Sequence, residues 1–169
     1  VKIYDGISKK QREIIVPKYK EQIVHHMAVN VLKGPFSHGM YEHTYGSIPK
    51  RGVHKAKRKI EKWIRNDPRN VKYCLKMDIK KFFPSIDQDV LKKKLSKLIT
   101  DKKFLDVIFE IIDVTEEGVP LGFFPSPWFA NFLLQDLDHK IKEKWGAKHY
   151  VRFVDDMVVF GSNKKELHK

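Results

Sequence analysis

Two apolar runs separated by a pair of adjacent acids constrain the fold of this chain most strongly. Residues 149–154 and 157–160 are rich in β-branched and aromatic side chains, and Asp155 and Asp156 lie between them. This pattern predicts two antiparallel strands joined by a short turn. The favoured turn pairs, Asn-Gly and Asp-Gly, are missing. Because adjacent negative charges repel unless a cation compensates them, the pattern indicates either a solvated hairpin tip or a metal site.

A third acid, Asp78, follows an apolar stretch that we expect to form a buried strand over 73–79. A lone acid in such a place is more often a helix cap or an ion-pair partner. A strand carrying Asp78 beside the predicted hairpin would, however, bring three carboxylates to one point. Carboxylate oxygens suit Mg²⁺, which also binds substrate phosphates. We therefore expect a site for two Mg²⁺ ions, or Mn²⁺ in their place, about 3.5–4 Å apart.

The rest of the pattern predicts an α+β fold in which helices pack on a small antiparallel sheet. Residues 1–17 resemble a strand or hairpin, and apolar periodicity predicts helices over 18–33, 53–65, about 102–113 and about 127–144. A further helix should begin near Pro84, with Ser85 or Asp87 as its cap.

The helix over 18–33 should bury one apolar stripe and end at Gly34-Pro35. The residues of that stripe are Ile23, Val24, Met27, Val31 and Leu32.

The charge of the chain favours a polyanionic partner. Its 34 Lys and Arg residues outnumber 21 Asp and Glu residues, which gives a formal charge of +13. Cations that neutralise phosphates release counterions, so nucleic acid fits such a chain, although a basic protein with no such partner fits the charge as well. Cys74 is the single cysteine, which excludes an internal disulfide, and no apolar run reaches membrane-spanning length. We therefore expect an intracellular protein without a membrane segment.

A loop rich in Gly and Pro precedes the last predicted helix. Gly118 and Gly122 lie among three prolines over residues 116–127. The loop is either an ordinary connection or a place where a nucleotide approaches the backbone closely.

Together these segments resemble the reverse transcriptases of group II introns and of bacterial relatives such as diversity-generating retroelements. Residues 77–83 resemble motif A, residues 118–127 the motif B loop, and residues 153–156 the Tyr-x-Asp-Asp box. Residues 12–17 and 45–54 are similar to two fingers motifs of the same group. Five motifs in this order are highly specific, whereas each one alone is weak.

The resemblance implies a fingers subdomain over 1–70 and a palm over 71–169, without the thumb that in this family grips the duplex. It implies an RNA-directed DNA polymerase that transfers dNMP to a primer 3′-hydroxyl. Its partners would be an RNA template, a DNA or RNA primer and dNTPs, in a cytoplasmic setting of a bacterium or phage. The sequence leaves open an accessory protein or a homodimer.

The resemblance also implies roles for individual residues. Asp78, Asp155 and Asp156 would bind the metal ions through their carboxylates, and Ile79 would bind through its backbone carbonyl. The residues expected to contact the nucleotide are Arg12, Lys18, Phe82, Phe83, Leu121 and Gly122. Among them Phe83 would be the gate that excludes a 2′-hydroxyl, and Phe82 is its competitor for that role. Those expected to contact template or primer are Arg51, Lys55 and Arg58. Ordinary core packing for the phenylalanines, and a solvated basic face for the cations, are the alternatives.

Two departures from the family pattern bear on the subfamily. Phe153 stands where Tyr is usual, and Leu121 stands where group II intron enzymes usually have Gln. Diversity-generating enzymes also have an aliphatic residue at the second position, but they follow Ser with Gln, where this chain has Pro127. Two other functions compete: an RNA-dependent RNA polymerase, and a non-catalytic RNA-binding module that keeps the palm shape.

Overall fold

The computed structural model describes residues 1–5 and 10–168 and divides the chain into two compact units, each built from segments far apart in the sequence. One unit contains residues 1–38 and 81–133, and the other contains residues 39–80 and 134–169. We call them the helical unit and the sheet unit. Within the described residues, no helix has the length and apolar character needed to cross a membrane.

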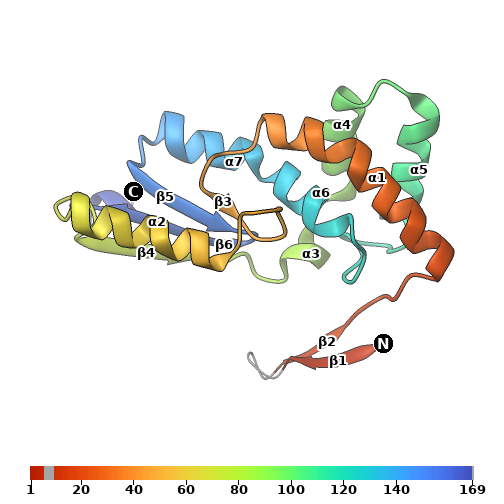
Figure 1. Cartoon of the computed structure of the whole chain (residues 1–169), viewed down its shortest axis with the longest axis horizontal. Helices are drawn as coiled ribbons and strands as arrows, with labels where there is room; N and C mark the ends of the chain where they lie inside the picture. Colours follow the sequence, from red (N-terminus) through yellow and green to blue (C-terminus); the bar gives the residue numbers. More distant parts are fainter. Residues whose placement is uncertain (6–9, 169) are drawn as a thin grey trace. The chain divides into compact units, whose positions relative to one another are not determined.

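The sheet unit is built on four strands, β3 (Thr44–Tyr45), β4 (Tyr73–Met77), β5 (His149–Phe153) and β6 (Asp156–Gly161). Their order in the sheet is β3-β5-β6-β4, as Figure 1 shows. The predicted hairpin is confirmed as β5 and β6, which pair antiparallel, and β6 pairs antiparallel with β4. The short β3 runs parallel to β5, so the sheet is mixed at that edge rather than wholly antiparallel.

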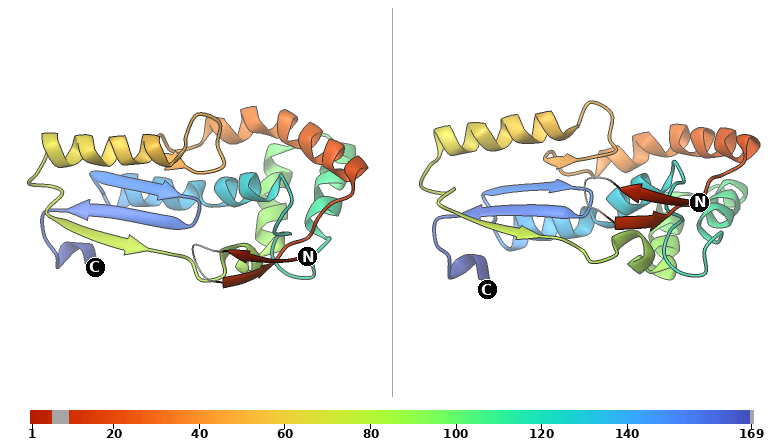
Figure 2. Two further views of the ribbon diagram at one scale, coloured as in Figure 1. Left: turned by 60° about the horizontal axis from the view of Figure 1, so that its bottom comes forward. Right: turned by 90° about the horizontal axis from the view of Figure 1, so that it is seen from below.

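Both faces of the sheet carry an apolar cluster because side chains alternate along each strand. On one face, Val151 and Val158 pack with Trp63 of α2 (Val53–Asn66), which runs along the sheet in both views of Figure 2. On the other face, Met157 and Tyr150 pack with Ile141. Because Ala56 and Trp63 of α2 face the sheet, the cations of this helix are left mostly in solvent.

The helical unit holds the hairpin of β1 (Lys2–Asp5) and β2 (Lys10–Glu13) and a group of helices. These helices are α1 (Tyr19–His38), α3 (Phe82–Ser85), α4 (Gln88–Leu98), α5 (Lys102–Ile112) and α6 (Ser126–Leu133). The Asp87 carboxylate accepts a hydrogen bond from the Val90 amide (2.9 Å) and caps α4, as one of the two predicted caps. The pair Asp5-Gly6 is a turn signal in the sequence, but Gly6 lies outside the described residues.

The prediction for α1 was wrong in two respects. The helix continues past Gly34-Pro35 to His38. Gly34 has no Cβ to clash with the proline ring, and Phe36 is fully buried and stacks on Phe132 with ring centroids 4.4 Å apart, so packing holds the last turn. The expected stripe is mostly in solvent.

Of that stripe only Leu32 is buried, while its other members are exposed: Ile23, Val24, Met27 and Val31. The buried face is instead formed by His25, Ala28, Val29, Leu32 and Phe36. Apolar residues occur on both sides of this helix, so periodicity alone does not identify the side that packs.

Two further expectations need correction. The strand at 73–77 is an edge strand with Tyr73 and Cys74 exposed, and it is not buried as predicted. The helix expected over 127–144 is divided into α6, α7 (Gln135–His139) and a π-helical turn, η1 (Lys140–Lys144). The break after Leu133 coincides with the boundary between the two units.

Candidate catalytic site in the sheet unit

The acidic pair lies at the tip of the β5–β6 hairpin. Phe153 pairs with Asp156, so the loop contains only Val154 and Asp155. Val154 has a φ of +58°, which is unusual for a β-branched side chain and costs about 1–3 kcal/mol. Asp155 and Asp156 are half-buried. The chain thus adopts an unfavourable backbone conformation directly before the two acids.

The register of β4 brings Asp78 to the same end of the sheet. Met77, the last residue of β4, pairs with Met157 of β6. Asp78 directly follows Met77, and Asp156 directly precedes Met157. Since side chains alternate, Asp78 and Asp156 lie on the same face as Lys76. The Lys76 ammonium is 3.1 Å from a carboxylate oxygen of Asp156, and this contact raises the pKa of Lys76. Asp78, far from the hairpin in sequence, therefore lies near it in space.

These acids fit a divalent ion in donor chemistry and in backbone position, because Mg²⁺ prefers carboxylate oxygens. Their side chains do not form a closed ligand set in this structure. Among residues 1–5 and 10–168, no three His, Cys, Asp or Glu side chains are close enough together to hold a metal ion. The Asp156 carboxylate is instead directed toward Lys76. The neighbouring Ile79 packs into the apolar cluster with Met77 and Tyr150.

The predicted gate and the motif B loop belong to the helical unit. Phe82 is buried, whereas Phe83 is half-buried, and their rings meet edge to face 5.7 Å apart. The Phe83 carbonyl accepts a hydrogen bond from the Val119 amide (3.0 Å). Gly118 has a φ of +69°, and a Cβ there would lie 2.3 Å from the Phe83 oxygen. The loop therefore presses against the backbone of Phe83.

Backbone contacts also fix the second glycine of this loop. The Leu121 carbonyl accepts from the Ile15 amide (2.8 Å), and a Cβ on Gly122 would lie 2.5 Å from the Ile15 oxygen. The Ser126 hydroxyl donates to the Pro120 carbonyl (2.6 Å). The close approach that glycine permits is thus used here by the protein's own chain.

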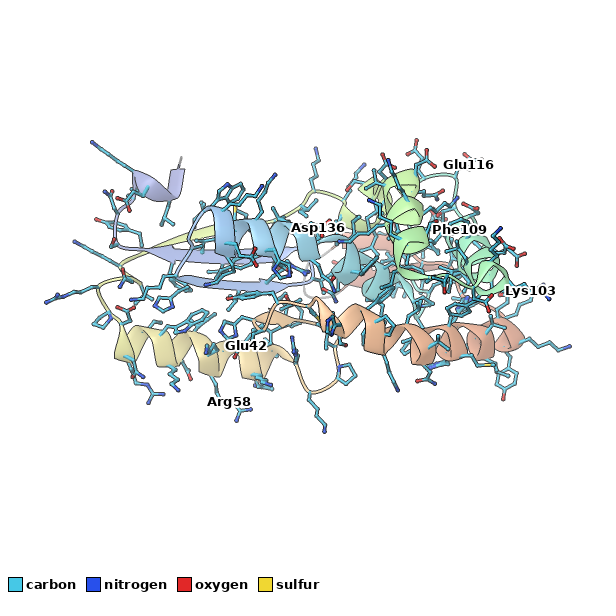
Figure 3. All side chains as sticks on the ribbon, turned by 90° about the horizontal axis from the view of Figure 1, so that it is seen from above. Glu42, Arg58, Lys103, Phe109, Glu116 and Asp136 are labelled. Carbon is cyan, nitrogen blue, oxygen red and sulfur yellow. The ribbon has the colours of Figure 1, made fainter. Side chains whose placement is uncertain are left out.

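The predicted phosphate-binding cations differ in how exposed their side chains are and in whether they already make hydrogen bonds within the chain. Lys18, Lys55 and Arg58 are exposed, and Figure 3 shows Arg58 extending from α2 away from the sheet. Arg51 is half-buried and its Nη1 donates to the Tyr41 carbonyl (3.1 Å). Arg12 lies in β2, but its side chain is outside the described residues.

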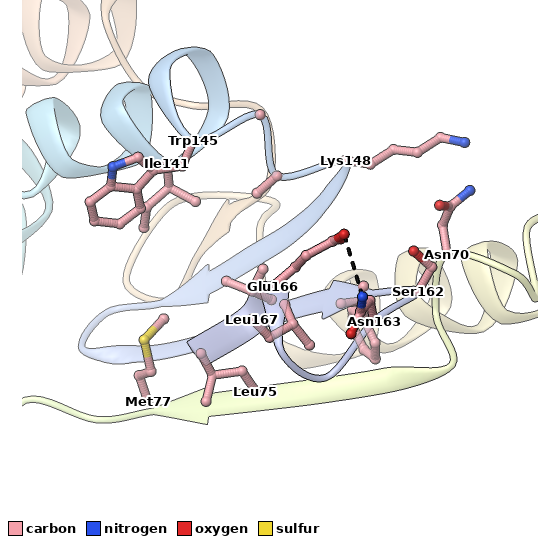
Figure 4. Close-up of a pocket in the computed structure, with 15 residues that line it drawn as sticks. Asn70, Leu75, Met77, Ile141, Trp145, Lys148, Ser162, Asn163, Glu166 and Leu167 are labelled. Carbon is pink, nitrogen blue, oxygen red and sulfur yellow. Dashed lines mark hydrogen bonds between the residues drawn. The ribbon is translucent and has the colours of Figure 1, made fainter. Parts of the chain in front are cut away.

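A hollow of about 570 Å³ opens elsewhere in the sheet unit. It is lined by Leu75, Val159 and Leu167 and by polar groups near residue 163, where Asn163 donates to Glu166 (3.5 Å), as Figure 4 shows. None of the three predicted metal-binding acids lines it.

The sequence interpretation missed a buried ion pair next to the hairpin tip. Arg152 and Asp138 are both fully buried, and the guanidinium binds both carboxylate oxygens. A signal was present, because an Arg between Val151 and Phe153 in a β pattern must find a partner if it points inward.

Comparison with known proteins agrees with these motifs. The family described as "Reverse transcriptase (RNA-dependent DNA polymerase)" matches residues 5–169. The chain is 28% identical to the retron Ec73 reverse transcriptase of Escherichia coli, over 90% of this chain and 51% of that protein. It is 25% identical to the group II intron-encoded protein LtrA of Lactococcus lactis subsp. cremoris, over 78% of this chain and 23% of that protein.

Solved structures show the same fold at lower identity. Telomerase from Candida tropicalis in complex with a fragment of telomeric RNA is 17% identical, with a TM-score of 0.63 over 83% of this chain and 29% of that one. The apo enzyme truncated at its C-terminal domain gives a TM-score of 0.59 at 19% identity. The chain thus spans about half the length of the retron relative and a smaller part of the others. The match over nearly its whole length shows that the chain belongs to the reverse transcriptase family.

Proposed function

We propose that the protein containing this chain is an RNA-directed DNA polymerase that adds dNMP units to a primer 3′-hydroxyl on an RNA template. The observation that carries the proposal is the position of Asp78, Asp155 and Asp156 at the same end of the sheet, in a chain of the reverse transcriptase family. The pairing of β4 with β6 puts the backbone of Asp78 at the end where the hairpin carries the other two acids, although 77 positions separate Asp78 from Asp155.

Asp78, Asp155 and Asp156, with the Ile79 carbonyl, would hold the metal ions. Two divalent ions, when bound, activate the attacking hydroxyl and stabilise the leaving pyrophosphate. Asp156 is the weakest candidate ligand, because its carboxylate already binds Lys76. Mg²⁺ is the proposed ion, with Mn²⁺ as a substitute.

Phe83 is the better candidate for the gate against a 2′-hydroxyl. It keeps accessible surface, whereas Phe82 is only 5% exposed and belongs to the core. Leu121 and Gly122 are proposed to face the nucleotide, with Lys18 and Arg12 on its phosphates. An aromatic ring beside the sugar leaves less room for a hydroxyl than a small side chain, which favours dNTP over NTP.

Lys55 and Arg58 are proposed to bind phosphates of template or primer, because both are exposed on a helix whose other face packs on the sheet. Arg51 is proposed for the same role, but its side chain can extend less far toward a phosphate because its guanidinium already donates to the Tyr41 carbonyl. The names fingers, for residues 1–70, and palm, for residues 71–169, stay part of this proposal.

Primer extension tests the function. An RNA template, a labelled DNA primer, dNTPs and Mg²⁺ should give extension with the longest natural form of the protein, and Asp155→Asn should abolish it. Asp87→Asn is the matched control, because that carboxylate caps α4 and lies in the helical unit. RNA binding without extension in Mg²⁺ or Mn²⁺ would favour a non-catalytic module, and extension with NTPs alone would favour an RNA polymerase.

A further inference from the structure

A fully buried ion pair lies beside the acidic hairpin. Arg152 in β5 and Asp138 in α7 have no side-chain exposure. The Arg152 Nη2 donates to one Asp138 oxygen (2.6 Å) and its Nε to the other (2.8 Å). This two-point geometry is the strongest form of the Arg–carboxylate contact.

Two further donors complete the surroundings of the carboxylate. The Tyr150 hydroxyl donates to Oδ1 of Asp138 (2.8 Å), and the Thr44 hydroxyl donates to Oδ2 (3.2 Å). Burial and the neighbouring charge of Asp138 raise the pKa of Tyr150, so the phenol stays protonated and remains a donor. Each oxygen thus accepts two hydrogen bonds, and β3, β5 and α7 meet at this point.

Such a pair is a poor way to stabilise a fold. Removing two charges from water costs several kcal/mol per ion, and apolar residues of the same size often serve as well. A buried pair is therefore weak evidence for stability, and the role of this pair has to be judged from the other contacts that Arg152 makes.

The third nitrogen of the guanidinium, Nη1, reaches the loop. The Arg152 Nη1 donates to the carbonyl of Val154 (2.8 Å), and the Val154 amide donates to the carbonyl of Tyr45 (3.1 Å). Val154 is the residue with φ +58°. Gly46 leaves the space its side chain needs, because a Cβ there would lie 2.8 Å from a Val154 methyl group. The strained residue is therefore held at its amide, its carbonyl and its side chain.

The carbonyl of Val154 belongs to the peptide that leads into Asp155. Fixing that carbonyl fixes the plane of the peptide and hence the direction in which the chain enters the acidic pair. We propose that the Asp138–Arg152 pair positions Asp155 and Asp156, with Asp138 as the anchor and Arg152 as the link to the loop. This inference rests on the proposed function, since it assigns positioning residues to the same site.

Two conservative variants test the proposal in the full protein. Arg152→Lys keeps the charge, but a single ammonium cannot bind both carboxylate oxygens and the Val154 carbonyl. Asp138→Asn keeps the shape and loses the charge. Tyr41→Phe is the matched control, because it removes one hydrogen bond to the Tyr150 carbonyl (3.2 Å) in the same unit without touching the pair.

Hydrogen exchange gives a readout that does not depend on activity. Both variants should speed exchange of the Val154 and Asp156 amides by about tenfold or more relative to Tyr41→Phe, while the amides that join β4 to β6 keep their rates. Thr44→Val, which removes a single donor from Asp138, should show a smaller effect of the same kind.

Kinetics give the second readout. A displacement of about 1 Å at a catalytic group can cost about 100-fold, so kcat should fall by about that factor while KM for dNTP changes less than about threefold. Unchanged loop exchange in both variants would overturn the proposal. Uniformly faster exchange throughout the sheet would also overturn it, because the pair would then only stabilise the fold. If the parent protein extends no primer, the proposed function fails, and loop exchange alone decides whether the pair holds the tip.

Discussion

Gly118→Ala should be the most damaging single-methyl change in the motif B loop. Gly118 has φ +69°, and an added Cβ would lie 2.3 Å from the Phe83 oxygen and 2.5 Å from Cα of Pro84. These are backbone atoms, so no side-chain rotation can relieve the contact. The loop or α3 must move.

The cost has three sources. A left-handed conformation costs an L-residue about 1–2 kcal/mol. Moving packed backbone apart costs about 1–3 kcal/mol, as overpacking does elsewhere. The hydrogen bond from the Val119 amide to the Phe83 carbonyl should lengthen, which forfeits up to about 1 kcal/mol. Together these contributions sum to about 2–6 kcal/mol, a large share of the stability of an ordinary domain.

Gly146→Ala is the matched control. Gly146 has nearly the same φ, +64°, but within the described part of the chain no atom beyond its two chain neighbours lies within 4 Å of the added Cβ. It should lose only the conformational term of about 1–2 kcal/mol, and the entropy that alanine removes from the unfolded chain is the same in both variants. Urea unfolding and hydrogen exchange of residues 83–89 and 115–123 would measure the difference. Equal destabilisation by the two variants would refute the steric argument.

Four further changes have expected outcomes. Lys76→Met should raise the affinity for Mn²⁺, measured by electron paramagnetic resonance, by up to about fivefold, because an exposed ion pair is worth about 0.2–1 kcal/mol; a weaker affinity would contradict this. Burial lowers the pKa of His43 from 6.5 to about 4, so the unfolded chain binds more protons between these values and stability should fall by up to about 3 kcal/mol as pH drops from 6.5 to 4. His43→Phe should remove that slope in urea unfolding. Arg58→Ala should make the negative slope of log RNA affinity against log salt concentration shallower by about 0.7–0.9. Lys103 is an exposed cation on α5, and Lys103→Ala should leave that slope unchanged. Leu121→Gln should reduce misincorporation, because an amide can hydrogen-bond near the nascent base pair; equal error rates would sink this idea.

Local patterns were sufficient where one side of an element is apolar and the other is not. The hairpin at 149–161 follows from its two apolar β runs, and the helix at 53–66 follows from the helical spacing of its apolar residues. The same method failed for α1, which has apolar residues on both of its sides. Which side of it is buried depends on Phe36 meeting Phe129 and Phe132, almost a hundred positions later.

In the candidate site, too, some features follow from the local sequence and others are visible only in the structure. The three acids stand out in the sequence because carboxylates in apolar β segments are unusual and because the family motifs name them, and their role as metal ligands stays a prediction. The partners of Asp156 and Arg152 could not, since Lys76 and Asp138 lie on other elements and meet them only through the register of β4 and the break between α6 and α7. The local sequence around Arg152 indicates that a partner is needed, but which residue supplies it is a property of packing.

Val154, in the loop between β5 and β6, is not a residue that such a tight turn normally prefers. A two-residue hairpin loop favours Gly, Asn or Asp at a position with positive φ, and this chain has a β-branched residue. A flexible glycine would relax the strain, but it would also let the following acids move. The side chain of Val154 packs over Gly46, its carbonyl accepts from Arg152 and its amide donates to the Tyr45 carbonyl, so three contacts offset the unfavourable backbone. A local rule broken where the surrounding structure compensates is the pattern expected of a functional site, and the two residues that follow Val154 are two of the three predicted metal-binding acids.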